Sequence, residues 1–163
     1  MEIGLVNNIF LFFGLMVLAK EDHESLLISN KKLLALVLFR LLSDAISLLY
    51  SYNFNKTTTG PIIQDLYLHL FLAFTVTLVL FLFAIFMPQA LGMGDVKLIG
   101  TLILYLGPAT FLLMLLSFVI LLIRVVLLKL RKTKADKLPL APFVFAAYTL
   151  ILTAIYLKFF VDQ

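Results

Sequence analysis

The sequence contains no cysteine and no tryptophan, and charged residues make up only 13% of its 163 residues. Without cysteine, the chain can form no disulfide, no thiolate nucleophile and no cysteine-ligated zinc or iron–sulfur site. Soluble globular proteins carry about 25% charged residues. The scarcity of charge, a hydrophobic fraction of 63% and a mean hydropathy of +1.13 together exclude an ordinary soluble fold.

The sequence contains several long, continuously apolar runs. Runs of roughly 18–20 apolar residues are typical of helices that cross a bilayer. The chain is therefore predicted to be an all-α polytopic membrane bundle of about six transmembrane helices, forming one membrane-embedded domain over residues 1–163. The predicted helices cover residues 3–19, 33–52, 66–87, 96–106, 109–128 and 139–160.

Turn-forming residues set the limits of these runs. The polar stretch 53–65 is predicted to be a loop, and Pro88 ends the third helix because proline cannot continue it without losing a hydrogen bond. Gly107 and Pro108 form a strong turn signal after the short segment 96–106. That segment spans roughly 16 Å, about half a bilayer, so we expect its neighbours to enclose it.

The basic residues are distributed unevenly between the predicted loops. Lysine and arginine concentrate on the cytoplasmic side of membrane proteins. Here they cluster in the loops after odd-numbered helices, which predicts that both termini face outward. The N-terminus lacks a basic leader region and a small-residue cleavage site, so it is interpreted as the first span. The clustered residues are Lys20, Lys31, Lys32, Lys129, Arg131, Lys132, Lys134 and Lys137.

Three aspartates lie in or beside the apolar runs, where ionisable groups are costly and often functional. Asp22 lies just past the first run and Asp95 just before the fourth, both at the predicted cytoplasmic edge. Asp44 lies about 18 Å into the second run. Arg40, four residues earlier on the same helical face, provides Asp44 with an ion-pair partner. Asp22 and Asp95 are therefore the pair expected to meet.

Two neighbouring carboxylates are suited to amide hydrolysis. Like charges a few ångströms apart cannot both ionise cheaply, so the pair shares a proton. The ionised partner activates water as a general base, and the protonated partner donates a hydrogen bond to the scissile carbonyl. This chemistry requires no metal, thiol or serine. The depth of the two acids alone is also consistent with ordinary solvated residues at the membrane interface that have no catalytic role.

The segment around Asp95 reads GMGDVKL and contains Gly92, Gly94 and Lys97 directly before an apolar helix. Glycine permits positive φ and close backbone approach, so we expect a loop with Gln89, Gly92 and Gly94 to enter the site. GMGDVKL resembles the second catalytic segment of the type IV prepilin peptidases, membrane aspartic peptidases with a GxGD motif.

Two further segments are similar to this family. Its first catalytic aspartate is followed, six to eight positions on, by a hydrophobic residue, Pro, and Asn or Asp; Asp22 is followed there by Ile28, Ser29 and Asn30. The segment PLAPF, with Pro139 and Pro142, is similar to the family's proline-rich entry to the last helix. Position 29 is serine where the family has proline, so we expect the turn after the first helix to have a different shape.

The resemblance implies a membrane aspartic endopeptidase with Asp22 and Asp95 as catalytic residues. Gly92, Gly94, Lys97, Asn30, Pro139 and Pro142 would support the motif and the substrate site. The implied partners are prepilin or pseudopilin precursors and membrane lipid, with no nucleic acid, metal or cofactor. Cleavage would occur at the cytoplasmic face of the cell membrane. Without cysteine, we expect no zinc-binding methyltransferase domain of the kind many relatives carry.

Two alternatives remain open from the sequence. A presenilin-like intramembrane peptidase would need its first aspartate inside a helix, so Asp44 would take that role. A non-catalytic membrane transporter or assembly factor would use the same charges as polar helix contacts. Lys97 either acts on the Asp95 carboxylate and substrate or extends to the membrane interface.

Overall fold

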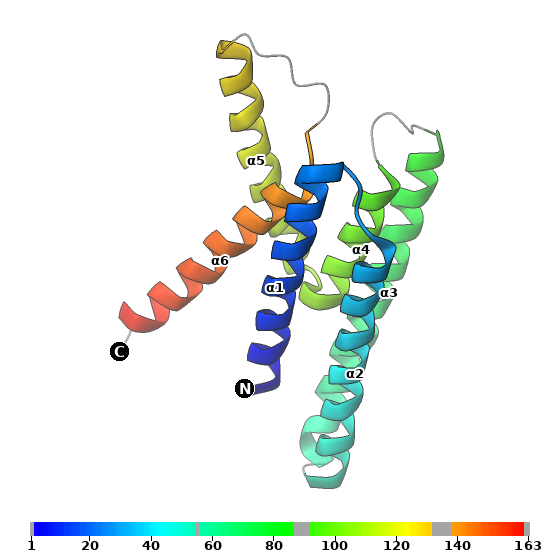
Figure 1. The fold of residues 1–163 in the computed structure, drawn as a ribbon. Helices are drawn as coiled ribbons and strands as arrows, with labels where there is room; N and C mark the ends of the chain where they lie inside the picture. The colour runs from blue at the N-terminus through cyan, green and yellow to red at the C-terminus, as the bar shows by residue number, and fades with distance from the viewer. Residues whose placement is uncertain (1, 55, 87–91, 132–137, 162–163) are drawn as a thin grey trace. The chain divides into compact units, whose positions relative to one another are not determined.

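The computed structural model describes residues 2–54, 56–86, 92–131 and 138–161, and within these ranges it contains six α-helices and no strand. Pro88 and Gln89, and Lys132, Lys134 and Lys137 of the predicted basic loop, lie outside the described residues. The all-α prediction is confirmed. The helices, shown in Figure 1, are α1 (Glu2–Ser25), α2 (Asn30–Phe54), α3 (Lys56–Phe86), α4 (Met93–Leu106), α5 (Ala109–Leu130) and α6 (Ala141–Val161).

Four of the described helices are long and apolar enough to cross a membrane. They provide the segments Asn30–Asn53, Gly60–Phe86, Ala109–Leu130 and Ala141–Lys158. By contrast, α4 has 14 residues, so it extends about 21 Å, short of the roughly 30 Å hydrocarbon core. Which side each terminus faces stays a prediction from the charge distribution.

The chain divides into two compact units. The first comprises Met1–Leu11 and Ser29–Thr110, and the second comprises Phe12–Ile28 and Phe111–Gln163. That residues 1–163 act as one membrane-embedded domain stays a prediction.

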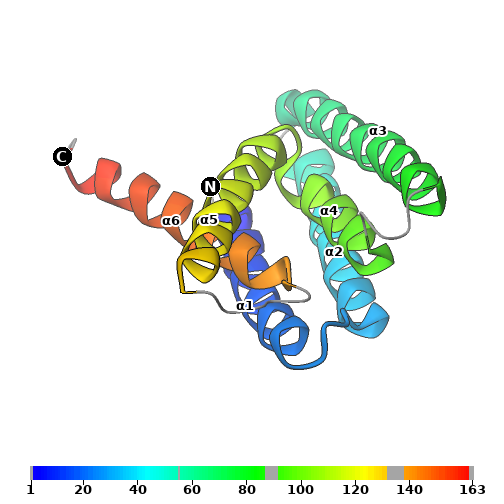
Figure 2. The same cartoon turned by 90° about the horizontal axis from the view of Figure 1, so that it is seen from above.

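The first unit is built around α4, which packs against both α2 and α3. Lys97 and Tyr105 of α4 contact Asn30 and Leu36 of α2, in the same chain order, so these two helices run parallel. Gly100 faces Thr77 of α3, and the later Gly107 faces an earlier α3 residue, so α3 runs antiparallel to α4. Figure 2 shows the three helices side by side from above.

Burial is concentrated on α4. Its buried residues are Val96, Leu98, Ile99, Thr101, Leu102, Ile103, Leu104 and Tyr105. Gly100 contributes a close helix contact, because a Cβ there would overlap the Thr77 hydroxyl of α3. The expectation that neighbouring helices enclose this short segment is therefore confirmed. Enclosure also provides protein contacts for an apolar helix too short to span the bilayer.

The second unit contains α1 from Phe12 onward, nearly all of α5 and the whole of α6. Phe12 of α1 contacts Phe145 of α6, with ring centroids 5.2 Å apart. Leu15 and Leu18 of α1 and Val144 of α6 are fully buried. The apolar side of α1 and the first turns of α6 thus contribute to the core of this unit.

Two predicted boundaries were wrong. The stretch 53–65 is not a loop, because α2 continues to Phe54 and α3 begins at Lys56. Pro61 lies inside α3, beyond its first turn, so it removes one backbone hydrogen bond without ending the helix. In addition, α1 continues through Lys20 to Ser25, since lysine and glutamate are good helix formers. Asp22 is therefore inside the last turns of α1 and not beyond them.

The predicted turn between the fourth and fifth helices is confirmed. Gly107 has φ +55° and its backbone N–H donates to the Ile103 carbonyl at 2.7 Å. Glycine adopts positive φ without steric cost. A Cβ at Gly107 would also overlap the ring of His69 on α3. Both the conformation and the close packing therefore require glycine here.

Candidate active site

Asp95 occupies the first turn of α4. Gly92 caps this helix and Met93 is its first residue, so Asp95 is the third residue of the helix. A carboxylate in the first turn is favoured because the unpaired N–H groups carry partial positive charge. The side chain is half-buried. The fold thus places this acid at the polar end of an otherwise buried apolar helix.

The two glycines before Asp95 do not have the role expected from sequence. Gly94 is inside α4, not in a loop, and Gly92 has φ −76° and ψ 146°, an ordinary extended conformation. What distinguishes Gly92 is space: a Cβ there would lie 3.2 Å from Asp95 Oδ2. The absence of a side chain therefore leaves room for the Asp95 carboxylate.

Lys97 and Asn30 are brought together from distant parts of the sequence. Lys97 Nζ donates a hydrogen bond to Asn30 Oδ1 at 2.9 Å. Asn30 is the first residue of α2 and Lys97 lies two residues after Asp95 in α4. This bond joins the start of α2 to the first turns of α4. It gives Lys97 a specific protein partner, which snorkelling to the interface alone would not require.

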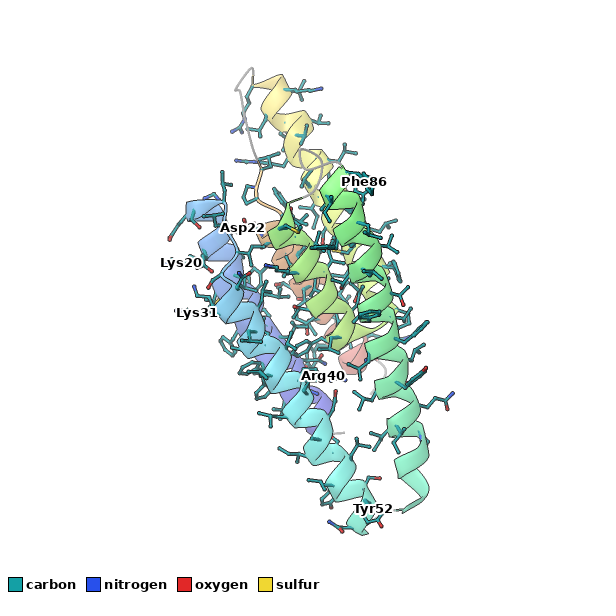
Figure 3. The ribbon with its side chains drawn as sticks, turned by 90° about the vertical axis from the view of Figure 1, so that its right-hand side faces the viewer. Lys20, Asp22, Lys31, Arg40, Tyr52 and Phe86 are labelled. Atoms are coloured by element: carbon teal, nitrogen blue, oxygen red, sulfur yellow. The ribbon has the colours of Figure 1, made fainter. Side chains whose placement is uncertain are left out.

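Asp22 contacts the proline-rich segment before the last helix. Its Oδ2 accepts a hydrogen bond from the backbone N–H of Ala141 at 2.9 Å. Ala141 is the first residue of α6 and lies between Pro139 and Pro142. Asp22 is only 5% exposed, so it is not the solvated acid that its position in the sequence permits. Figure 3 shows Asp22 near the end of α1.

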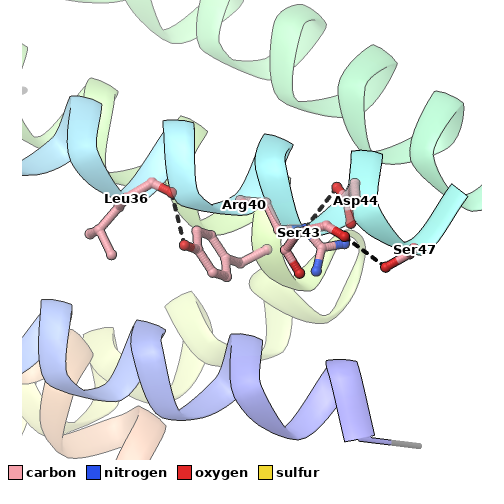
Figure 4. Close-up of polar contacts among 6 residues, drawn as sticks. Leu36, Arg40, Ser43, Asp44 and Ser47 are labelled. Carbon is pink, nitrogen blue, oxygen red and sulfur yellow. Dashed lines mark hydrogen bonds and ion pairs between the residues drawn. The ribbon is translucent and has the colours of Figure 1, made fainter. Parts of the chain in front are cut away.

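Asp44 has a different partner. Arg40 Nε lies 3.1 Å from Asp44 Oδ2 within α2, as the i, i+4 spacing predicted (Figure 4). The Arg40 guanidinium also lies 5.8 Å from the ring centroid of Tyr105, whose hydroxyl donates to the Leu36 carbonyl at 2.8 Å. Asp44 thus belongs to a polar cluster on the α2–α4 face.

The position of Asp44 along α2 separates it from Asp95. Lys97, two residues beyond Asp95, is bonded to Asn30 at the start of α2. Asp44 lies fourteen residues further along that helix, which is about 21 Å. A dyad of Asp44 with Asp95 therefore has no support in the packing of the first unit.

The two predicted catalytic aspartates belong to different compact units. Asp22 belongs to the second unit and Asp95 to the first. Asp22 accepts a hydrogen bond from Ala141 in the proline-rich segment. Lys97, two residues after Asp95, is bonded to Asn30. Ala141 was not singled out by sequence. Its signal was available, since Pro139 and Pro142 leave few N–H groups in that segment.

Comparison with known proteins identifies the family. The model of the type IV leader peptidase family matches residues 9–128, which include Asp22 and Asp95. The chain belongs to the type IV leader peptidase family. No curated protein and no solved structure matches it significantly. The proline-rich segment 139–142 lies outside the matched residues.

As a leader peptidase, the chain is a hydrolase of peptide bonds, and its four apolar helices make it a membrane protein. Among the residues that the structure describes, no group of three or more histidine, aspartate or glutamate side chains is placed to hold a metal ion.

Proposed function

We propose that this leader peptidase is an aspartic endopeptidase in which Asp22 and Asp95 form the catalytic pair. Its substrates are precursors of the prepilin or pseudopilin type. Cleavage occurs at the cytoplasmic face of the cell membrane, after a short basic leader and before the hydrophobic helix of the substrate.

In the proposed mechanism the two carboxyl groups share one proton. The ionised carboxylate takes a proton from water as the oxygen attacks the scissile carbonyl carbon. The protonated carboxyl donates its hydrogen bond to the carbonyl oxygen, where negative charge develops. Proton transfer to the leaving nitrogen then breaks the C–N bond. These steps reverse the roles of the two acids and restore the starting proton count.

The observation that carries the proposal is the position of the acids within a leader peptidase chain. Asp22 and Asp95 each lie at the polar end of an apolar helix. Asp22 accepts a hydrogen bond from the proline-rich segment, and Asp95 lies two residues before Lys97, which is bonded to Asn30. The third candidate, Asp44, is already ion-paired with Arg40. The presenilin-like alternative, which needs Asp44, is therefore less well supported.

The test uses purified protein and a prepilin substrate, with the N-terminus of the product mapped by mass spectrometry. We expect wild-type protein to cut once, at the junction of leader and hydrophobic helix. Asp22→Asn and Asp95→Asn should each lower kcat by more than about 10³-fold, because the two acids act as one unit. Both variants should remain in the membrane at wild-type levels.

Asp44→Asn is the matched control. It removes a carboxylate at membrane depth without touching the proposed pair, so kcat should stay within a few-fold of wild type. The melting temperature should fall, because Arg40 loses its ion-pair partner. Full activity in Asp22→Asn together with loss in Asp44→Asn would transfer the catalytic role to Asp44.

A further inference from the structure

The first turn of α6 has one backbone donor that the helix does not use itself. The first N–H groups of a helix have no intrahelical acceptor. In α6 the second residue, Pro142, has no N–H, whereas Phe143 and Val144 both donate to the Leu140 carbonyl, at 3.1 and 3.2 Å. The Ala141 N–H is directed instead to the Asp22 carboxylate.

The hydrogen bond is buried at both ends. Ala141 is fully buried and Asp22 is 5% exposed. A buried carboxylate needs hydrogen-bond donors to offset its lost hydration, and a backbone N–H on a helix is a rigid donor. The bond engages Oδ2 of Asp22, so it restrains the position of this oxygen relative to the first turn of α6.

We propose that the Ala141 backbone N–H is a positioning group for catalysis, which holds Asp22 Oδ2 and orients Oδ1 for its role in peptide hydrolysis. This inference rests on the proposed function of Asp22. It assigns a purpose to the spacing of Pro139 and Pro142: the prolines have no N–H, so only Leu140 and Ala141 between them can donate from the backbone, and Ala141 is the donor to Asp22. The orientation of the Asp22 carboxyl group should affect kcat, since small displacements of a reacting group lower reaction rates strongly.

The decisive variant is Ala141→Pro. Proline is well tolerated at the first position of a helix, so α6 should persist while the donor is removed. We expect kcat on a prepilin substrate to fall about 10- to 100-fold with KM within about twofold of wild type. Ala141→Gly keeps the N–H and should recover most of kcat.

Ala109→Pro is the control for proline at the first position of a helix, because Ala109 is the first residue of α5, directly after Pro108. The kcat and KM of Ala109→Pro should equal those of wild type. The melting temperature of Ala141→Pro separately reports the cost of burying a proline ring, since Ala141 is buried and Ala109 is exposed. If Ala141→Pro keeps wild-type kcat per folded molecule, or if Ala141→Gly loses as much as Ala141→Pro, the positioning role is wrong. A role limited to stability would lower the melting temperature and leave kcat unchanged.

A second measurement requires no proline variant and no substrate. Hydrogen exchange at the Ala141 amide should accelerate by about tenfold in Asp22→Ala relative to wild type, because the acceptor is gone. An unchanged exchange rate at the Ala141 amide in Asp22→Ala would show that the hydrogen bond between Ala141 and Asp22 does not form. If wild-type protein exchanges as expected but cleaves no prepilin, the proposed function fails while the hydrogen bond stands. If wild type cleaves the prepilin and Ala141→Pro cleaves it equally well, the positioning role is wrong and the proposed function stands.

Discussion

At the scale of single residues, the clearest constraint is the space beside the Asp95 carboxylate. Gly92→Ala would place a Cβ 3.2 Å from Oδ2, so the carboxylate must shift by a few tenths of an ångström. We expect kcat to fall by about three- to tenfold. Replacing the glycine cap should change the free energy of unfolding by less than about 1 kcal/mol. Steady-state kinetics and thermal melting measure the two effects.

Gly60→Ala provides the control for this substitution. Gly60 lies within α3 and has open space where a Cβ would be added. Alanine in a helix is favoured over glycine by about 0.5–1 kcal/mol, but a Cβ at position 60 is disfavoured in a helix directly before Pro61. The two effects oppose each other, so the free energy of unfolding should change by less than about 1 kcal/mol and the variant should be fully active. Equal kinetics in Gly92→Ala and Gly60→Ala would show that the space beside Asp95 has no catalytic importance.

The Lys97–Asn30 hydrogen bond gives a second prediction at this scale. Lys97→Met and Asn30→Ala should each lower the free energy of unfolding by up to about 1 kcal/mol, the usual net value of such a bond. Because both variants remove the same contact, the double variant should lose little more than either single variant. Reversible unfolding in mixed micelles measures this coupling. Simple addition of the two losses would mean that the bond contributes nothing.

At the scale of helices, the close contact of α3 and α4 depends on Gly100. A Cβ there would overlap Thr77 Oγ1. We expect Gly100→Ala to cost about 1–3 kcal/mol through overpacking. Thr77→Ala removes the obstructing atoms, so Gly100→Ala/Thr77→Ala should recover much of that loss. Thermal unfolding of the four proteins tests this, and an equally unstable double variant would contradict the contact.

Several features could be predicted directly from the sequence, because residues close together in the chain determine them. The turn at Gly107 and Pro108 predicted the end of α4, and the length of α4 predicted its enclosure. The i, i+4 spacing predicted the Arg40–Asp44 pair. In each case, residues close together in the chain determine the result, through helix geometry alone.

Other features depend on packing or on weak local signals, and the sequence did not predict them. Polar residues in 53–65 indicated a loop, but α2 and α3 extend into this stretch, because polar side chains alone do not end a helix. The role of Gly92 was assigned to positive φ, whereas the structure shows that it provides space. The Asp22–Ala141 bond joins residues 119 positions apart, and a partner so distant requires the tertiary fold.

At the scale of the whole molecule, the proposed mechanism couples the two compact units. Each unit carries one of the two proposed catalytic aspartates, Asp95 in the first and Asp22 in the second. Two carboxyl groups that share one proton during peptide hydrolysis must lie within a few ångströms of each other. The proposal therefore predicts that the working enzyme brings positions 22 and 95 together in the membrane.

The absence of cysteine makes this approach directly measurable, since introduced thiols have no competitor in the chain. A disulfide requires Cβ atoms about 3.5–4.5 Å apart. We therefore expect Asp22→Cys/Asp95→Cys to cross-link on oxidation in native membranes, detected by protection from alkylation and by mass spectrometry. Asp44→Cys/Asp95→Cys should not cross-link, because about 21 Å of α2 separates Asp44 from the level of Lys97 and Asn30. Cross-linking of the control pair alone would favour the Asp44 dyad, and no cross-link in either pair would remove the geometric basis of the proposed mechanism.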